Sequence, residues 1–342
     1  MATTLRVGVI GTGVMGQDHA RNLARGVGRA SLCALADIDE PATRTLADTL
    51  SVPLTFTDGH DLIRSGEVDA VIIAAPDRFH APYLQSCMEL GLPVLCEKPL
   101  APTVEEAATV VRRSREISNP LVTVGFMRRF DPGYQAMRRL LDDRAYGDVL
   151  MTHSVHRNVE AHPGEGSSAT LTNSAVHEID ILPWLCRSPI VEVLWAAGRP
   201  TSLLSSRHDP QLVLLRDATG VLHTVELMVH AQYGYDVRCE LVCERGTVEL
   251  PDVPALVEQH PLLVNSARSR ASAYPADWRP RFAAAYRAEL SAWVEATLAG
   301  QIPDDAATMN EALQATIVAE ALVTSMRDGG WTAVPSLDKV VS

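Results

Sequence analysis

A glycine-rich turn close to the N-terminus constrains the fold of this chain more than any other feature. The four apolar residues Val7–Ile10 have the composition of a short buried strand, and apolar residues at helical spacing follow the turn. Gly11, Gly13 and Gly16 complete a G-x-G-x-x-G pattern. A strand, such a turn and a helix form a cradle for a pyrophosphate, because glycine admits the ligand to the backbone and the helix offers free N–H groups.

A second apolar segment, Leu32–Ala36, ends at Asp37. This position lies roughly 20 residues beyond the glycines, where an acid can bind the ribose 2′-hydroxyl of a dinucleotide. We therefore interpret the region as a dinucleotide site, with an unused glycine turn as the alternative. Ile38 and Asp39 follow, and two carboxylates would repel a 2′-phosphate, so the pattern favours NAD over NADP. Arg44, further along, is the residue that could favour NADP instead.

Composition and charge narrow the partners of the chain. Its 342 residues suggest two domains, and a hydrophobic fraction of 46% is ordinary for a globular protein. A formal net charge of −12 argues against nucleic acid and anionic membranes as partners. No stretch approaches the roughly 18 apolar residues of a membrane span. There is no room for a signal peptide, and the 6 scattered cysteines favour reduced thiols, so a cytoplasmic location is expected.

The order of expected elements divides the chain into two parts. Strands and helices alternate up to residue 124, which is typical of a doubly wound, mostly parallel α/β sheet. After Gly125, strands predominate and one helix, Ala175–Leu185, interrupts them. We expect an α/β Rossmann domain over residues 1–124 and an α+β domain with an open, mainly antiparallel sheet over 125–307. A helix at about 308–328 could pack back on the first domain, and Pro251–Pro280 is expected to be irregular.

Polar residues follow two expected strands of the first domain, and ligands bind beyond the carboxyl ends of strands in open α/β sheets. At the second of these ends, Pro99 disfavours helical geometry at Lys98, so this lysine could donate a hydrogen bond to a substrate oxygen. A solvated surface lysine is the alternative. The residues expected to hold the cofactor are Gly11, Gly13, Val14, Met15, Gly16, Asp37, Ile38, Ala75, Pro76, His80, Glu97 and Lys98.

A third polar cluster, Thr172–Asp180, lies in the second domain. His177 follows Asn173 by about one helical turn, and a histidine can accept a proton near neutral pH. A helix capped by Asn173 or Ser174, with a buried structural histidine, is the alternative. The H-E-x-x-H zinc pattern is not fulfilled because Ile181 occupies its last position. Other sets with ligand spacing are absent, so we expect no metal site.

The glycine turn, Glu97-Lys98-Pro99 and the H-E-x-D piece His177–Asp180 together resemble the Gfo/Idh/MocA oxidoreductases, the family of glucose–fructose oxidoreductase and inositol dehydrogenase. The bacterial inositol dehydrogenase branch is similar at Gly125–Asp131, His156–Asn158, Tyr233–Asp236, Arg281-Phe282 and Tyr286. The resemblance covers nearly the whole chain. It implies NAD-dependent oxidation of a secondary ring hydroxyl of a cyclic polyol, and a homo-oligomer, often a tetramer formed through the second-domain sheets.

The resemblance also implies roles for single residues. Lys98 would hold the reacting oxygen and His177 would take the hydroxyl proton. The family usually has an aspartate one turn before this histidine, whereas this chain has Asn173, which cannot stabilise an imidazolium by charge. The residues expected to bind substrate are Arg128, His156, Asn158, Asn173, His177 and Tyr235.

Alternatives remain open at this point. Arg128 and Arg129 could instead be a solvated pair. The substrate could be a sugar or an aminocyclitol, with ketone reduction as the working direction. Outside the enzymes, Asn173 could mark a dinucleotide-binding sensor that has lost turnover, although the retained Lys98 and His177 argue against this reading.

Overall fold

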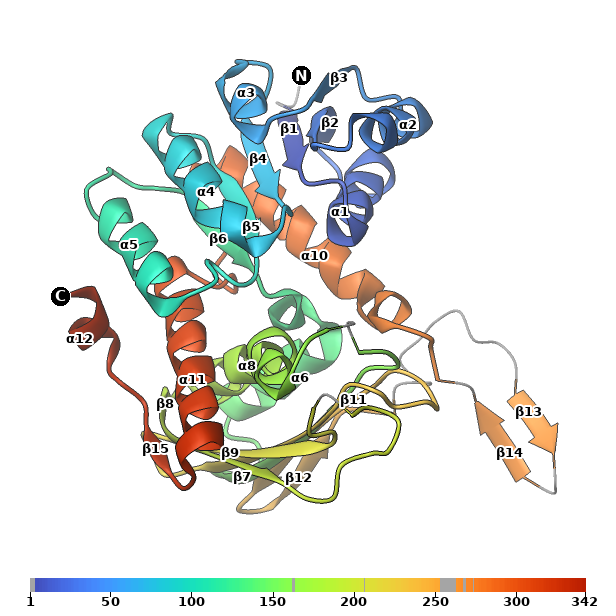
Figure 1. The fold of residues 1–342 in the computed structure, drawn as a ribbon, viewed down its shortest axis with the longest axis vertical. Coiled ribbons are helices and arrows are strands. Elements are labelled where there is room, and N and C mark those ends of the chain that lie inside the picture. Colours follow the sequence, from blue (N-terminus) through green and yellow to red (C-terminus); the bar gives the residue numbers. More distant parts are fainter. Residues whose placement is uncertain (1–3, 162–163, 206, 253–262, 267–268, 273) are drawn as a thin grey trace. The chain divides into compact units, whose positions relative to one another are not determined.

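The computed structural model describes residues 4–161, 164–205, 207–252, 263–266, 269–272 and 274–342 (Figure 1). The chain divides into two compact units. The first comprises Met1–Phe130, Ala285–Thr316 and Leu337–Ser342, and the second comprises Asp131–Ala284 and Ile317–Ser336. Helices α10 (Trp278–Leu298) and α11 (Met309–Asp328) each contribute residues to both units. No helix of the described residues is both long and apolar enough to cross a membrane.

The first unit contains a six-stranded parallel sheet in the order β3-β2-β1-β4-β5-β6. Its strands are β1 (Leu5–Ile10), β2 (Ala30–Ala36), β3 (Leu54–Phe56), β4 (Ala70–Ile73), β5 (Val94–Glu97) and β6 (Val122–Gly125). Its helices are α1 (Val14–Arg25), α2 (Glu40–Leu50), α3 (Gly59–Arg64), η1 (Asp77–Phe79), α4 (His80–Glu89), α5 (Val104–Ser114), η2 (Met127–Phe130) and α12 (Leu337–Val341). The strand order reverses between β1 and β4, which confirms the doubly wound fold and places a ligand crevice at the carboxyl ends of these strands.

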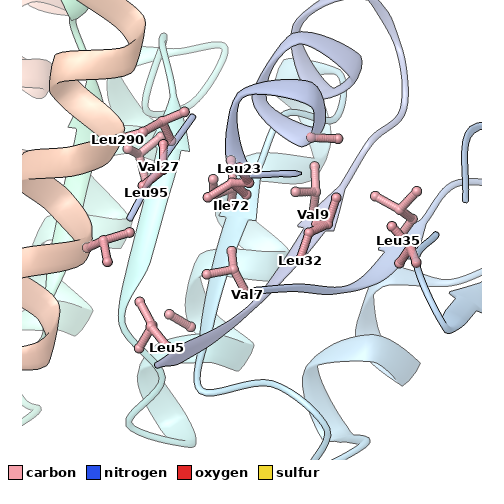
Figure 2. Packing of buried hydrophobic residues seen from close by; sticks show 14 of the residues in the cluster. Leu5, Val7, Val9, Leu23, Val27, Leu32, Leu35, Ile72, Leu95 and Leu290 are labelled. Atoms are coloured by element: carbon pink, nitrogen blue, oxygen red, sulfur yellow. The ribbon is translucent and has the colours of Figure 1, made fainter. Parts of the chain in front are cut away.

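Helices cover both faces of this sheet because its strands are apolar on both sides. On one face, Leu23 of α1, Leu46 of α2 and Leu290 of α10 join the strand residues in one buried cluster (Figure 2). On the other face, a Cβ at Gly8 would lie 2.7 Å from Leu62 of α3, so β1 and α3 are in close contact. Residues 285–307 had been expected in the second domain, and their packing in this cluster explains why they belong to the first unit.

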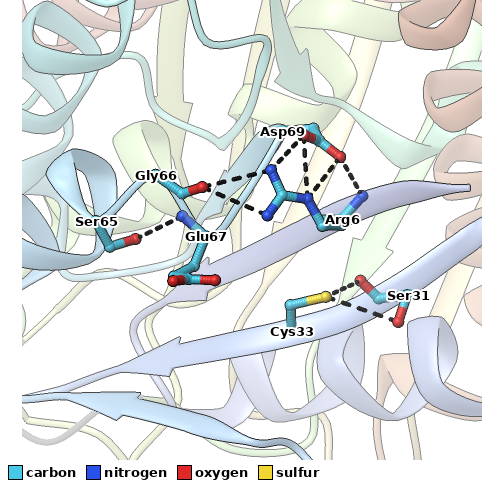
Figure 3. A network of polar contacts seen from close by, with 7 residues as sticks. All are labelled: Arg6, Ser31, Cys33, Ser65, Gly66, Glu67 and Asp69. Carbon is cyan, nitrogen blue, oxygen red and sulfur yellow. Dashed lines mark hydrogen bonds and ion pairs between the residues drawn. The ribbon is translucent and has the colours of Figure 1, made fainter.

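A polar network joins the start of β1 to the residues that lead into β4 (Figure 3). Arg6 donates to both carboxylate oxygens of Asp69, with a shortest N–O distance of 2.8 Å, and to the carbonyl of Gly66. The backbone N–H of Arg6 also donates to Asp69, at 2.9 Å. The guanidinium lowers the pKa of Asp69, so the pair is charged at neutral pH and supports the register of β1 and β4.

The second unit contains a seven-stranded sheet in the order β12-β11-β7-β10-β9-β8-β15. Its strands are β7 (Val149–Arg157), β8 (Ile190–Ala197), β9 (Gln211–Asp217), β10 (Leu222–Met228), β11 (Asp236–Cys243), β12 (Gly246–Glu249) and β15 (Thr332–Ala333). A separate pair consists of β13 (Leu263–Ser266) and β14 (Ser269–Ser272). The helices of the second unit are α6 (Pro132–Asp142), α7 (Ser167–Ala169), the π-helical turn η3 (Thr170–Ser174) and α8 (Val176–Cys186).

The sheet of the second unit is mixed, because β7 and β10 pair in parallel while the other neighbours are antiparallel. The turns at Ala218–Gly220 and Glu244–Gly246 each join two antiparallel strands. The expectation of an irregular Pro251–Pro280 is partly wrong, since β13 and β14 lie within it. Residues 253–262, 267–268 and 273 of that segment lie outside the described residues.

Candidate active site

The glycine turn follows β1 at the point where the strand order reverses. Gly11 has a φ of +91°, and a Cβ there would lie 2.5 Å from the Ala74 carbonyl oxygen. A Cβ at Gly16 would lie 1.8 Å from the carbonyl oxygen of Gly11. No described atom lies within 4 Å of a Cβ built on Gly13. The turn therefore needs glycine at Gly11 and Gly16 for its own packing, whereas Gly13 leaves open space for a ligand.

Helix α1 begins directly after this turn. No acidic residue lies in its first turn, and no side chain caps it. The first N–H groups of a helix have no partner within the helix, and with the helix dipole they favour an anion. Gly13 and Val14 are exposed and Met15 is half-buried. These residues fit the pyrophosphate of a dinucleotide, as the sequence predicts.

Asp37 follows β2 beside the same turn. Its Oδ2 accepts a hydrogen bond from the Thr12 N–H at 2.6 Å, and its Oδ1 accepts one from the Asp39 N–H at 3.0 Å. Ile38 between them is 86% exposed. The carboxylate is thus fixed next to the glycine turn, where a ribose hydroxyl could donate to it.

The other charges near Asp37 have roles within helix α2. Asp39 caps the helix by accepting from the Ala42 N–H at 3.1 Å, and Arg44 is paired with Glu40 at 2.5 Å. Arg44 is therefore engaged by a carboxylate of its own helix. This pairing weakens the alternative in which Arg44 binds a 2′-phosphate.

His80 lies between the segments that follow β4 and β5. Its Nε2 is 2.8 Å from the carbonyl oxygen of Ala75, and its Nδ1 is 2.7 Å from that of Pro99. The ring is buried, whereas Pro76 is exposed. His80 therefore joins the segment after β4 to the segment that carries Lys98.

Glu97 is the last residue of β5, and its carboxylate is buried. Its Oε1 lies 2.7 Å from Nε2 of the fully buried His19 in α1. The ring of Tyr286 meets the His19 ring edge-on, at a centroid distance of 5.8 Å. Glu97 thus ties β5 to the helix behind the glycine turn, and it fixes the backbone from which the half-buried Lys98 projects. Sequence analysis missed His19, which carries no motif of its own.

Arg128 and Arg129 lie in η2, just after β6. Both are buried, so the alternative of a solvated pair is wrong. Arg129 donates to Glu311 of α11 at 2.9 Å. A buried arginine keeps its charge, so these residues place two cations inside the first unit.

In the second unit the structure brings His156, His177 and Tyr235 together. The His156 ring centroid lies 6.0 Å from that of His177 and 6.1 Å from that of Tyr235. Nδ1 of His156 lies 2.9 Å from Oε2 of Glu178, and both side chains are buried. A carboxylate only accepts, so Nδ1 donates to it, and Nε2 is left as the acceptor when the ring is neutral. Sequence analysis did not assign this orienting role to Glu178.

Asn158 and Asn173 lie at the edge of this group. Asn158 donates to the Ser174 hydroxyl at 3.3 Å, and Asn173 donates to Oε1 of Glu165 at 3.1 Å. Asn173 belongs to η3, and Ala175 precedes α8 without a side-chain cap. The alternative in which Asn173 or Ser174 caps this helix is therefore wrong.

Matches to known proteins cover both parts of the chain. The model of an oxidoreductase family with an NAD-binding Rossmann fold matches residues 5–126. The model of the GFO/IDH/MocA C-terminal domain matches residues 134–249. Together they describe the order of domains that the structure shows.

Individual relatives match over almost their whole length. The inositol 2-dehydrogenase 2 of Paenarthrobacter aurescens is 46% identical over 96% of this chain and 98% of its own. The inositol 2-dehydrogenase 1 of Saccharopolyspora erythraea is 43% identical, with 98% of each chain covered. Among solved structures, the myo-inositol dehydrogenase of Lactobacillus casei in complex with NAD(H) and myo-inositol is 27% identical, with a TM-score of 0.91 and 98% of each chain covered.

Proposed function

The chain belongs to the Gfo/Idh/MocA oxidoreductase family, and on this premise we propose that it is an NAD-dependent dehydrogenase that oxidises a secondary ring hydroxyl of a cyclic polyol, with myo-inositol as the first candidate. The full-length likeness to inositol 2-dehydrogenases carries this proposal. Bound NAD would accept the hydride. The glycine turn, the uncapped start of α1 and Asp37 suit that cofactor.

The chemistry requires two groups of the protein. An alcohol becomes a ketone when its carbon loses hydride and its oxygen loses a proton. In this proposal His177 accepts the proton and Lys98 donates a hydrogen bond to the oxygen as negative charge develops there. Each buried hydroxyl of a polyol needs a polar partner. His156, whose ring is oriented by Glu178, is a proposed partner for one of them.

Assembly and location form part of the same proposal. Leu194 of β8 and Leu212 and Leu214 of β9 lie on the sheet face opposite Val193, Val213 and Leu215, and Leu212 is 41% exposed. Leucines on an open sheet face suit contact between copies of the chain, as in the tetramer that the resemblance implies.

The free thiols of the cysteines suit the cytoplasm. Sedimentation of the full chain tests the assembly.

A substrate panel tests the function. The full chain is incubated with NAD and myo-inositol, scyllo-inositol, glucose or an aminocyclitol, and formation of reduced cofactor is followed by absorbance. The reverse reaction is followed with the corresponding ketones. We expect turnover with a cyclitol. Absence of turnover with every cyclitol, despite measurable NAD binding, would favour the dinucleotide-binding sensor instead.

Lys98→Met supplies a matched variant for this panel. We expect kcat to fall by at least about a hundredfold, because a donor to the developing oxyanion is lost. The Kd for NAD should stay within a few-fold of the parent value. The only other lysine in the sequence, the exposed Lys339, provides the control variant Lys339→Met, which should leave kcat unchanged. Near-parental turnover of Lys98→Met would make Lys98 a surface cation with no part in the reaction.

A further inference from the structure

Three side chains of metal-ligand type meet in the second unit, and none of them belongs to the candidate active site. One ligand atom each from Cys186, Asp217 and His223 lies within 4.8 Å of the other two. Cys186 ends α8, Asp217 ends β9, and His223 lies in β10. The side chains of Asp217 and His223 are fully buried, and Cys186 is partly exposed. Their wide separation in sequence explains why no ligand spacing revealed them.

One polar atom of the Asp217 side chain and one of the His223 side chain are held by hydrogen bonds. The second polar atom of each side chain lies near that of the other. Oδ1 of Asp217 accepts from the Thr219 N–H and hydroxyl and from the Val221 N–H, at 2.8–2.9 Å. Nδ1 of His223 lies 3.0 Å from the Thr152 hydroxyl. Within the described part of the chain, Oδ2 of Asp217 and Nε2 of His223 are buried without a hydrogen-bond partner. Such outer contacts orient metal ligands in proteins.

The distance between Oδ2 of Asp217 and Nε2 of His223 suits binding of one cation by both atoms better than a hydrogen bond between them. Nε2 of His223 and Oδ2 of Asp217 are 3.8 Å apart, which is too long for a hydrogen bond. Two ligand atoms at about 2.1 Å from a tetrahedral ion would be roughly 3.4 Å apart, so only a small contraction is needed.

We propose that Cys186, Asp217 and His223 bind one Zn²⁺ ion, with a water molecule as the fourth ligand. Sulfur, imidazole and carboxylate together are a ligand set that zinc prefers. A thiolate and a carboxylate also neutralise the charge of the dication, which favours its burial.

The ion would anchor the helix that carries His177. Cys186 is the last residue of α8 and His177 lies in its first turn. Pro183 lies inside this helix and has no N–H to donate, so the last turn lacks one hydrogen bond. Zinc at Cys186 would tie this weakened end to β9 and β10. The proposal does not depend on the identity of the substrate.

Metal content tests the site directly. Untagged full-length protein is equilibrated with Zn²⁺, freed of unbound metal by gel filtration and analysed by mass spectrometry for metals. We expect close to one zinc ion per chain. Cys186→Ser and His223→Gln should retain less than about a tenth of that amount. Cys33→Ser, which alters a partly exposed cysteine of the first unit, should retain it all. A metal-free parent, or equal zinc in Cys186→Ser and parent, would overturn the proposal.

A second measurement uses the parent protein alone, so its result does not depend on whether a variant folds. The parent is treated with iodoacetamide in the presence and absence of Zn²⁺, and alkylation of each cysteine is followed by peptide mass spectrometry. Zinc should slow alkylation of Cys186 at least tenfold, because the metal occupies the thiolate, and leave Cys33 unchanged. Equal rates at Cys186 with and without zinc would show that it is not a ligand.

Discussion

At the scale of single residues, Asn173 has the largest consequence for the proposed chemistry. It stands where the family resemblance implies an aspartate, and its amide donates to Glu165 at 3.1 Å. An aspartate there would favour the imidazolium form of His177, but it would also face the carboxylate of Glu165. Asn173 therefore gains a hydrogen bond to the Glu165 carboxylate but lacks the negative charge that could assist proton acceptance.

We predict that Asn173→Asp moves the acid limb of the pH profile of kcat/KM upward. The added carboxylate should raise the pKa of His177, so that the free base required for oxidation appears only at higher pH. Asn173→Ala removes the amide without adding charge and should not move the limb upward. Superimposable profiles of parent and Asn173→Asp would mean that residue 173 is not coupled to the group that takes the proton.

Asp37 serves both the glycine turn and the proposed ribose contact. Asp37→Ala should weaken NAD binding about ten- to a hundredfold, because hydrogen bonds to a charged group are lost. It should also narrow the preference for NAD over NADP. Asp39→Ala is the control: it removes a helix cap worth about 1 kcal/mol of stability and should leave NAD affinity within a few-fold. Tighter binding of NADP than of NAD to the parent, measured by titration, would contradict this view of Asp37.

At the scale of elements, the start of α11 makes a prediction about acid stability. Glu311 accepts from the N–H and hydroxyl of Thr308 and from Arg129. Burial alone would raise the pKa of Glu311, but the charge of Arg129 and the Thr308 donors outweigh it and lower the pKa. A lowered pKa in the folded state stabilises the fold above the pKa of the unfolded chain, and this stabilisation is lost as the pH falls through the folded-state pKa.

Glu311→Gln should therefore reduce the free energy of unfolding at neutral pH by no more than about 1 kcal/mol, since the carboxylate is partly exposed and screened. The difference from the parent should shrink as the pH falls through the pKa of Glu311. Glu320→Gln, at an exposed position of the same helix, should show little change at any pH. Urea unfolding at several pH values provides the measurement. A deficit that stays constant down to acid pH would rule out the lost charge as its cause.

Elements with a strong local pattern could be predicted from the sequence, and those set by distant contacts could not. The N-cap of α5 at Thr103, which accepts from the Glu106 N–H, and the strand that precedes Asp37 have local patterns, and the structure has both. Strand β3, with only three residues, has too little periodicity to detect. The parallel pairing of β7 with β10 depends on partners about 70 residues apart in sequence.

The same distinction applies to the candidate site. The glycine turn could be predicted because its backbone geometry requires glycine. The burial of Arg128 and the contact of His19 with Glu97 could not, because they depend on elements that meet only in the fold. The cluster of Cys186, Asp217 and His223 joins three separate elements, so no short spacing marks it.

At the scale of the whole molecule, the proposed reaction is the transfer of hydride from a ring carbon of a cyclic polyol to NAD. The residues proposed to hold the cofactor lie in the first unit, and His177, the proposed proton acceptor, lies in the second. Myo-inositol carrying deuterium at every ring carbon tests this transfer most directly. The full chain is incubated with NAD and this substrate, and the reduced cofactor is analysed by mass spectrometry. We expect one deuterium in each molecule of NADH formed. Unlabelled NADH, or no NADH while NAD remains bound, would contradict it.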